Sequence, residues 1–163
     1  MIVELTQEHA LYVCQNMRES DFRECMETIW QANDGDNAAL IASHCMNANG
    51  PKWVAINREG VAVVIGGVAL TAPCVGTAWM IGTDEWLSVA LEVSRFCKSS
   101  MKTMFDSGVV HRIHAFSATF HTESHRWLEL VGLTAGPTLK QWGKNKEDFI
   151  LFEALSSGES LCV

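Results

Sequence analysis

Histidine is the side chain best suited to proton and metal chemistry near neutral pH, and four of the six histidines of this chain fall between positions 111 and 125. Two of them, His111 and His114, stand in a segment rich in β-branched and aromatic residues, which predicts a strand over 109–119. Their odd spacing directs them to opposite faces of that strand. One of the two could therefore reach a cleft beside the strand and act as a general base. Ordinary surface or hydrogen-bonded histidines are the alternative.

The other two histidines, His121 and His125, belong to the run HTESH, which invites comparison with a zinc-binding helix. The metalloprotease pattern is HExxH, but here the glutamate stands third and no third metal ligand is evident. We therefore predict no metal site. The run is instead expected to open a helix over 122–132, with both histidine rings exposed and Glu123 favourable at the helix N-terminus.

Two further elements must position these residues. The apolar run VGTAWMIG predicts a strand over 75–82. Apolar residues at helical spacing then predict a long helix over about 84–106. Thr83 is a suitable N-cap for that helix, and Gly108 is a suitable residue just past its C-terminus.

The rest of the chain divides into short segments separated by turn residues. Phe22, Cys25, Met26, Ile29 and Trp30 recur at helical spacing and predict a stripe that faces the core. Further elements are expected as follows: a strand over 2–5, a helix over 7–17 capped by Thr6, a helical segment capped by Asp36, strands over 52–57 and 61–70, and strands over 133–143 and 148–155.

A pair of adjacent glycines, Gly66 and Gly67, interrupts the strand at 61–70 and predicts a bulge or a close approach to the backbone. The strands are otherwise continuously apolar, which favours burial on both faces. A central mixed, mostly antiparallel sheet flanked by helices buries these segments best, so we predict an α/β (α+β) fold. One domain over 1–155 accounts for all the elements, and 156–163 is expected to be a flexible tail.

This order of elements, with a long central helix and a short helix that ends at a glycine, resembles the GNAT acetyltransferase fold. SHRWLELVGL (124–133) is similar to the fourth-helix signature of that family. The resemblance implies that the strands at 75–82 and 109–119 splay apart and hold the pantetheine arm of acetyl-CoA between them. It also implies the residues that would bind the cofactor if it binds at all: Met80, Ile81, Gly82, Ser88, Ala90 and His121.

The chain departs from the GNAT pattern where that family grips the cofactor's pyrophosphate. The expected R/Q-x-x-G-x-G/A falls at 88–93, which reads SVALEV and holds neither arginine nor glycine. Glycines there let backbone N–H groups reach a phosphate. Asp84, Glu85 and Glu92 instead supply carboxylates, each of which repels a phosphate by about 1 kcal/mol when exposed. The general-acid tyrosine of the family is also missing, because Leu128 takes its place.

A second resemblance is narrower. MRESDFREC (17–25), AWMIGTDEW (78–86) and SHRWLELVGL are similar, in the same order, to the internal virion protein A family of short-tailed bacteriophages. That family is GNAT-like in shape and serves virion morphogenesis. The resemblance implies phage or host proteins as partners, and a location in the host cytoplasm during infection or in the virion.

Composition argues against several classes of function. The net charge of −7 and the lack of a basic stripe disfavour nucleic-acid binding. The longest apolar run, 61–70, is too short to span a membrane, and the N-terminus lacks the pattern of a signal peptide. The six cysteines are scattered without a CxxC pair, which fits a reducing cytoplasm.

Three hypotheses remain open. The missing pyrophosphate loop and the phage resemblance favour an internal virion protein that acts through protein contacts and keeps a degenerate acetyl-CoA site. The preserved order of elements favours an active acetyl-CoA-dependent N-acetyltransferase acting on a small amine or a protein amine. The acidic surface and the tryptophans, especially Trp86 and Trp142, allow a third hypothesis, an inhibitor of a host protein.

Overall fold

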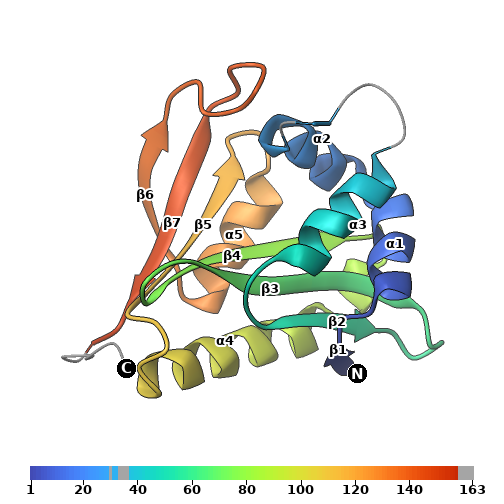
Figure 1. Ribbon diagram of the computed structural model, residues 1–163, viewed down its shortest axis with the longest axis horizontal. Coiled ribbons are helices and arrows are strands. Elements are labelled where there is room, and N and C mark those ends of the chain that lie inside the picture. The colour runs from blue at the N-terminus through green and yellow to red at the C-terminus, as the bar shows by residue number, and fades with distance from the viewer. Residues whose placement is uncertain (30, 33–36, 158–163) are drawn as a thin grey trace.

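The computed structural model describes residues 1–29, 31–32 and 37–157 (Figure 1). The helices and strands follow the order expected from the sequence. Their bounds are β1 (Ile2–Glu4), α1 (Gln7–Gln15), α2 (Glu19–Thr28), α3 (Ala38–Asn47), β2 (Lys52–Ile56), β3 (Ala62–Ala72), β4 (Val75–Gly82), the 3-10 helix η1 (Trp86–Ser88), α4 (Ala90–Asp106), β5 (Arg112–Ala118), α5 (Thr122–Val131), β6 (Thr134–Leu139) and β7 (Phe149–Leu155).

The strands form one sheet of seven in the spatial order β1-β2-β3-β4-β5-β7-β6. Neighbouring strands are antiparallel except β4 and β5, which run parallel. A parallel pair needs a long crossover connection, and α4 supplies it. The predicted α/β (α+β) class, with a central mixed and mostly antiparallel sheet flanked by helices, is therefore confirmed.

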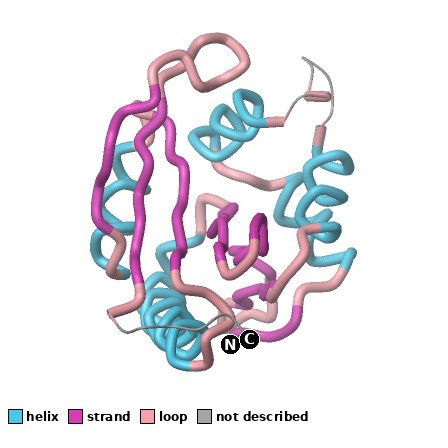
Figure 2. Tube along the Cα trace, turned by 60° about the vertical axis from the view of Figure 1, so that its left-hand side comes forward, coloured by secondary structure: helices cyan, strands magenta, loops and turns pink. Residues whose placement is uncertain are grey.

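Helices cover both faces of the sheet. Figures 1 and 2 show α1, α2 and α3 on one side and α4 and α5 on the other. Ile41 of α3 packs in one core with Ile65 of β3. Val93 of α4 and Leu128 of α5 belong to the cores on the opposite face. This double cover explains why residues 62–67 of β3 are all buried.

The adjacent glycines of β3 seat two tryptophan rings. A Cβ atom on Gly66 would lie 2.6 Å from the ring of Trp53, and one on Gly67 would lie 3.0 Å from the ring of Trp79. Successive residues of a strand face opposite sides, so the two rings lie on opposite faces of the sheet. Strand pairing is regular at both glycines. The predicted close approach to the backbone is confirmed, and the pair forms no bulge.

The long helix begins later than predicted. The turn η1 precedes α4, whose N-cap is Val89. Thr83 does not cap α4, because its Oγ1 accepts the backbone N–H of Glu85 at 3.3 Å and so supports the tighter 3-10 turn. Gly108 ends the helix as predicted, with a φ of 73°.

The predicted stripe of the second helix faces less of the core than its spacing suggested. Among the described residues of α2, Asp21 is the one that is buried, and the apolar members of the stripe are half-buried. Trp30 and the expected cap Asp36 lie outside the described residues, and so does most of the predicted tail at 156–163. The most buried side chain of α2 is therefore polar.

The described helices include none with the length and apolar character needed to cross a bilayer. Cys14, Cys25, Cys45 and Cys97 are free thiols. Cys74 is disulfide-bonded, which the expectation of a reducing cytoplasm did not include.

The packing of Trp53 on Gly66 predicts a specific cost for a methyl group at that position. The substitution Gly66→Ala should lower the free energy of unfolding by about 1–3 kcal/mol, because an overpacked side chain forces its neighbours to move. Urea unfolding followed by far-UV circular dichroism measures this change.

A double-mutant cycle with Trp53→Leu provides the control. If the indole ring is what the new methyl group meets, the alanine should cost less in the Trp53→Leu background, with a coupling of about 0.5–3 kcal/mol. Equal costs in the two backgrounds would show that the ring is not the constraint.

Candidate functional site

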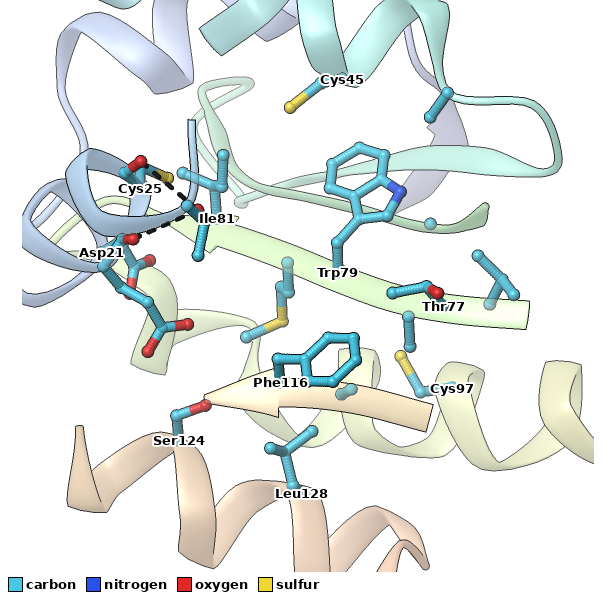
Figure 3. A pocket seen from close by; sticks show the side chains of 18 of the residues that line it. Asp21, Cys25, Cys45, Thr77, Trp79, Ile81, Cys97, Phe116, Ser124 and Leu128 are labelled. Atoms are coloured by element: carbon cyan, nitrogen blue, oxygen red, sulfur yellow. Dashed lines mark hydrogen bonds between the residues drawn. The ribbon is translucent and has the colours of Figure 1, made fainter. Parts of the chain in front are cut away.

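The strands β4 and β5 pair at one end and part at the other. Their ladder joins Val75 to Arg112, Gly76 to Ile113 and Thr77 to His114, although β4 continues to Gly82 and β5 to Ala118. A cavity of about 350 Å³ lies where they diverge (Figure 3). It is lined by residues from both faces of the sheet, among them Trp79, Met80, Cys97, Phe116, Trp127 and Leu128.

The backbone edges of both strands face this gap. Gly82 donates its N–H away from β3, to Asp21 Oδ2 at 2.6 Å, and alternate residues of an antiparallel strand direct their polar groups the same way. The C=O of Ala78 and both backbone groups of Met80 therefore point toward β5 beyond the last ladder pair. By the same alternation the backbone N–H and C=O groups of Phe116 face the gap from β5, because Ala118 donates its N–H to Glu24 and not to β7.

The thiols that line the cavity are held in their protonated form. Three thiols line it, from Cys25, Cys45 and Cys97. Burial raises the pKa of the Cys97 thiol to about 12, and burial also raises the pKa of Cys25. A hydrogen bond with Cys14, together with burial, raises the pKa of Cys45. These thiols remain protonated at neutral pH and do not act as nucleophiles.

A buried ionic cluster spans the wide end of the gap. Arg18 Nε donates to Asp21 Oδ1 at 2.9 Å. His121 lies between two carboxylates, with Nε2 3.3 Å from Asp21 Oδ1 and Nδ1 3.0 Å from Glu24 Oε2. Glu24 Oε2 also accepts the Ser117 hydroxyl at 3.1 Å. The cluster links α2 to the ends of β4 and β5 and to the start of α5.

Burial sets the electrostatics of this cluster. Arg18 is 7% exposed, Asp21 4% and His121 5%. Burial raises the pKa of Asp21, while Arg18, the Gly82 N–H and His121 oppose that shift by stabilising the carboxylate. The Arg18 guanidinium also lies 5.1 Å from the centre of the Trp86 ring. The carboxylates of Asp21 and Glu24 thus accept the backbone N–H groups at the ends of β4 and β5, which would otherwise be open to a ligand.

The connection from β4 to α4 uses most of its backbone donors internally. Thr83 N–H binds Val63 O, and Trp86 N–H binds Thr83 O. Further along, Ser88 N–H binds Glu85 O and Val89 N–H binds Trp86 O. The side chains of Asp84 and Glu85 are exposed. These N–H groups are therefore not open to a phosphate, and 83–89 contains no glycine that would expose others.

The histidines predicted from the sequence fall in different places. His111 is exposed and precedes β5, so it does not share the strand with His114 as predicted. His114 Nε2 lies 3.0 Å from Thr77 Oγ1, and its Nδ1 is buried without a partner in the described structure. The prediction that His121 and His125 are both exposed is wrong, because His121 is buried and His125 is half-buried.

The predicted cofactor-binding residues also lie in different surroundings, and only some of them face the gap. Met80 directs its backbone into the gap. Ile81 faces β3 in the ladder, where it pairs with Ile65. The Gly82 N–H is bonded to Asp21. Ser88 lies in η1 with its N–H in use, and Ala90 is the first residue of α4.

Sequence reasoning missed the ionic cluster. Arg18, Asp21 and Glu24 recur every three residues, which places them on one helix face, and they lie within the run MRESDFREC. That periodic charge was the available signal. In the described residues no group of three or more His, Cys, Asp or Glu side chains is arranged to hold a metal ion.

Solved structures of acetyltransferases match the whole arrangement. A GNAT-family acetyltransferase from Bacillus anthracis matches with a TM-score of 0.70 at 17% identity, over 96% of this chain and 95% of that one. The ribosomal-protein-S5-alanine acetyltransferase from Vibrio fischeri matches at 0.68 and 15%, over 98% and 94%. A mutant spermidine N-acetyltransferase from Vibrio cholerae matches at 0.69 and 11%, over 96% and 95%.

The chain has the GNAT fold. No protein-family model matches its sequence, and no curated protein matches it either. At these identities the structural matches establish the GNAT fold alone. The parted strands of the GNAT sheet are β4 and β5, as the sequence resemblance implied. The narrower resemblance to internal virion proteins stays a prediction.

The ionic cluster predicts a large stability loss when one of its members is removed. Asp21→Ala leaves the Arg18 charge buried with a weaker partner and the Gly82 N–H without its acceptor. We expect a loss of about 3–5 kcal/mol in the free energy of unfolding, measured by urea titration. Glu123→Ala is the matched control, since that carboxylate is 70% exposed and 3.5 Å from Arg18. It should cost less than about 0.5 kcal/mol. Similar losses for the two variants would contradict the buried-cluster interpretation.

His114 predicts a component of pH-dependent stability. Burial and the nearby Arg112 lower its pKa below the ordinary value, with Glu153 opposing. The unfolded chain therefore binds the proton first as the pH falls, and stability is lost below about pH 6.5. The free energy of unfolding should drop less between pH 7 and pH 5 in His114→Gln than in the wild type. Thr77→Val, which keeps the imidazole, should retain the wild-type slope. An unchanged slope in His114→Gln would refute this assignment.

Proposed function

We propose that the chain is an N-acyltransferase in which the gap between β4 and β5 holds the pantetheine arm of an acyl thioester such as acetyl-CoA. One observation carries the proposal: the open backbone edges at Ala78, Met80 and Phe116 face a cavity of about 350 Å³ with apolar walls. An unpaired strand edge recruits an extended amide chain. The GNAT fold of the chain supports the same reading.

The residues fit one part of acetyl-CoA well. Pantetheine is an extended arm in which amides alternate with short alkyl segments. The open edge of β4 complements its amides, and the side chains of Met101, Trp127 and Leu128 offer apolar contact on the α4 and α5 side. The diphosphate of the nucleotide finds no such complement in the connection from β4 to α4. Four N–H groups there are bonded within the chain, and Asp84 and Glu85 are exposed.

The chain's own residues would bind the arm, exclude water and accept a proton, while the bound thioester would supply an activated acyl group. Thr77 lines the cavity, and its Oγ1 lies 3.0 Å from His114 Nε2 and 3.0 Å from Thr71 Oγ1. Because the pKa of His114 is lowered, its ring is neutral at pH 7 and can accept a proton through the Thr77 hydroxyl. Thr77 and His114 thus form the route by which an attacking amine would lose its proton.

The acceptor would enter from the side of α2 and α3. Trp79, Ile41 and Cys45 give that side an apolar character, and the carboxylates of Asp21 and Glu24 are engaged with Arg18 and His121. An amine that carries an apolar group suits such a chamber better than a polycation. A small amine or a protein amine is the proposed acceptor class.

A space-filling substitution tests the cleft directly. Ala78→Leu adds bulk at the floor of the gap, so it should lower kcat/KM for acyl transfer from acetyl-CoA by about ten-fold or more. Release of free thiol from acetyl-CoA in the presence of a panel of amines measures the rate. Ala72→Leu, an exposed position at the end of β3 and outside the cavity, is the matched control and should stay within about two-fold.

Two outcomes would count against acyl transfer. One is equal rates for the Ala78→Leu and Ala72→Leu variants, which would place the reaction elsewhere. The other is an absence of calorimetric binding of both CoA and pantetheine at millimolar concentration.

A second candidate function is supported by a different observation. Asp21 and Glu24 occupy the amides at the wide end of the gap, and Trp142 remains 52% exposed beside the same sheet. An internal virion protein acting through protein contacts, with a degenerate acetyl-CoA site, would have these properties, and so would an inhibitor of a host protein. Phage or host proteins would then be its partners, in the host cytoplasm or the virion. Trp142→Ala should then abolish association with the particle or target, and unchanged association would count against this function.

A further inference from the structure

We infer that the cleft recognises the pantetheine thioester itself and gains no affinity from the nucleotide of CoA, so that its donor is a nucleotide-free pantetheine thioester. This inference rests on the proposed function, because it names the chemical class of donor for the same site. It follows from three features of the β4 end of the cleft: N–H groups that are hydrogen-bonded within the chain, exposed carboxylates, and cations that are paired or lie outside the cleft.

The occupied donors come first. A diphosphate is bound in proteins by several converging N–H groups at a glycine-rich turn and helix start. Here the N–H groups of Thr83, Glu85, Trp86, Ser88 and Val89 each bind an oxygen of the protein. To offer them to a phosphate, the chain would have to break η1 and the link from Thr83 to Val63. These N–H groups therefore have acceptors within the turn or in β3.

The charges at this turn point the same way. Asp84 and Glu85 are exposed at its start, and Glu85 is held there by Asn57 Nδ2 at 3.0 Å. Glu92, in the first turn of α4, is paired with the N-terminal ammonium of Met1 at 3.1 Å. Carboxylates at a helix start satisfy the helix dipole in the way a bound phosphate would. A diphosphate placed here would meet negative charge and find the dipole already complemented.

The cations near this end are either paired or lie outside the cleft. Arg18 is the basic group at the wide end of the cleft, and its guanidinium is already bound by Asp21 and Glu123. Arg58 and Arg95 line a second hollow at the start of α4, which also includes Glu92 and shares no lining residue with the cleft. A diphosphate drawn to those arginines would also meet the Glu92 carboxylate, which lines the same hollow.

The comparison of two donors with and without the nucleotide tests this inference. Isothermal titration calorimetry and steady-state kinetics are run with acetyl-CoA and with S-acetylpantetheine on the full chain. We expect dissociation constants within about three-fold of each other, or tighter binding of S-acetylpantetheine. Binding of acetyl-CoA about ten-fold tighter or more, equal to 1.4 kcal/mol, would overturn the inference and leave the proposed function standing. No binding of either donor would sink both.

Neutral variants of Asp84 and Glu85 test whether these acids repel the diphosphate or merely offer it no contact. Asp84→Asn combined with Glu85→Gln should tighten acetyl-CoA by about three-fold or more at low salt and leave S-acetylpantetheine unchanged, because only the former carries the diphosphate. Glu129→Gln, also an exposed carboxylate, lies near the C-terminal end of α5; this variant is the matched control and should change the binding of neither donor. An equal change for both donors in the double variant would contradict the assignment of these acids to the nucleotide position.

Discussion

The structure depends on one local event, the parting of β4 and β5 after a ladder that ends at Thr77 and His114. A sheet that separates in its middle leaves polar backbone groups facing each other across a gap, and such groups must find partners or open space. The chain solves this in two ways along the same gap. Near the ladder it leaves a cavity of about 350 Å³. At the far end it fills the space with charged side chains of α2.

The filled end explains why α2 is the least apolar of the helices beside the sheet. Buried charges are costly unless each is paired and hydrogen-bonded. Asp21 and Glu24 each accept a strand-end amide and also face a basic group. The helix is thus attached to both halves of the divided sheet by polar contacts. Removal of one partner leaves the others buried without compensation, so the cluster behaves as a unit.

The fold was predictable from sequence because its main elements carry strong periodic signals. The helix that ends at Gly108 and the apolar strand at 75–82 have the lengths and end residues that local rules describe. The resemblance placed the cleft between the correct strands. The cluster was not predictable in the same way, because a charged stripe on a short helix is more often solvated. His121 was misjudged for that reason, since its burial depends on Asp21, a hundred residues earlier in the chain.

The seating of Trp79 on a bare stretch of backbone has a consequence for what the cleft can tolerate. The indole packs directly on the backbone at Gly67, so a ligand that contacts the ring cannot displace it toward the sheet. The opposite wall includes Met80 and Met101, whose unbranched side chains can change conformation. A ligand of greater width would therefore have to displace side chains on the side of Met80 and Met101, because the aromatic wall rests on the sheet backbone.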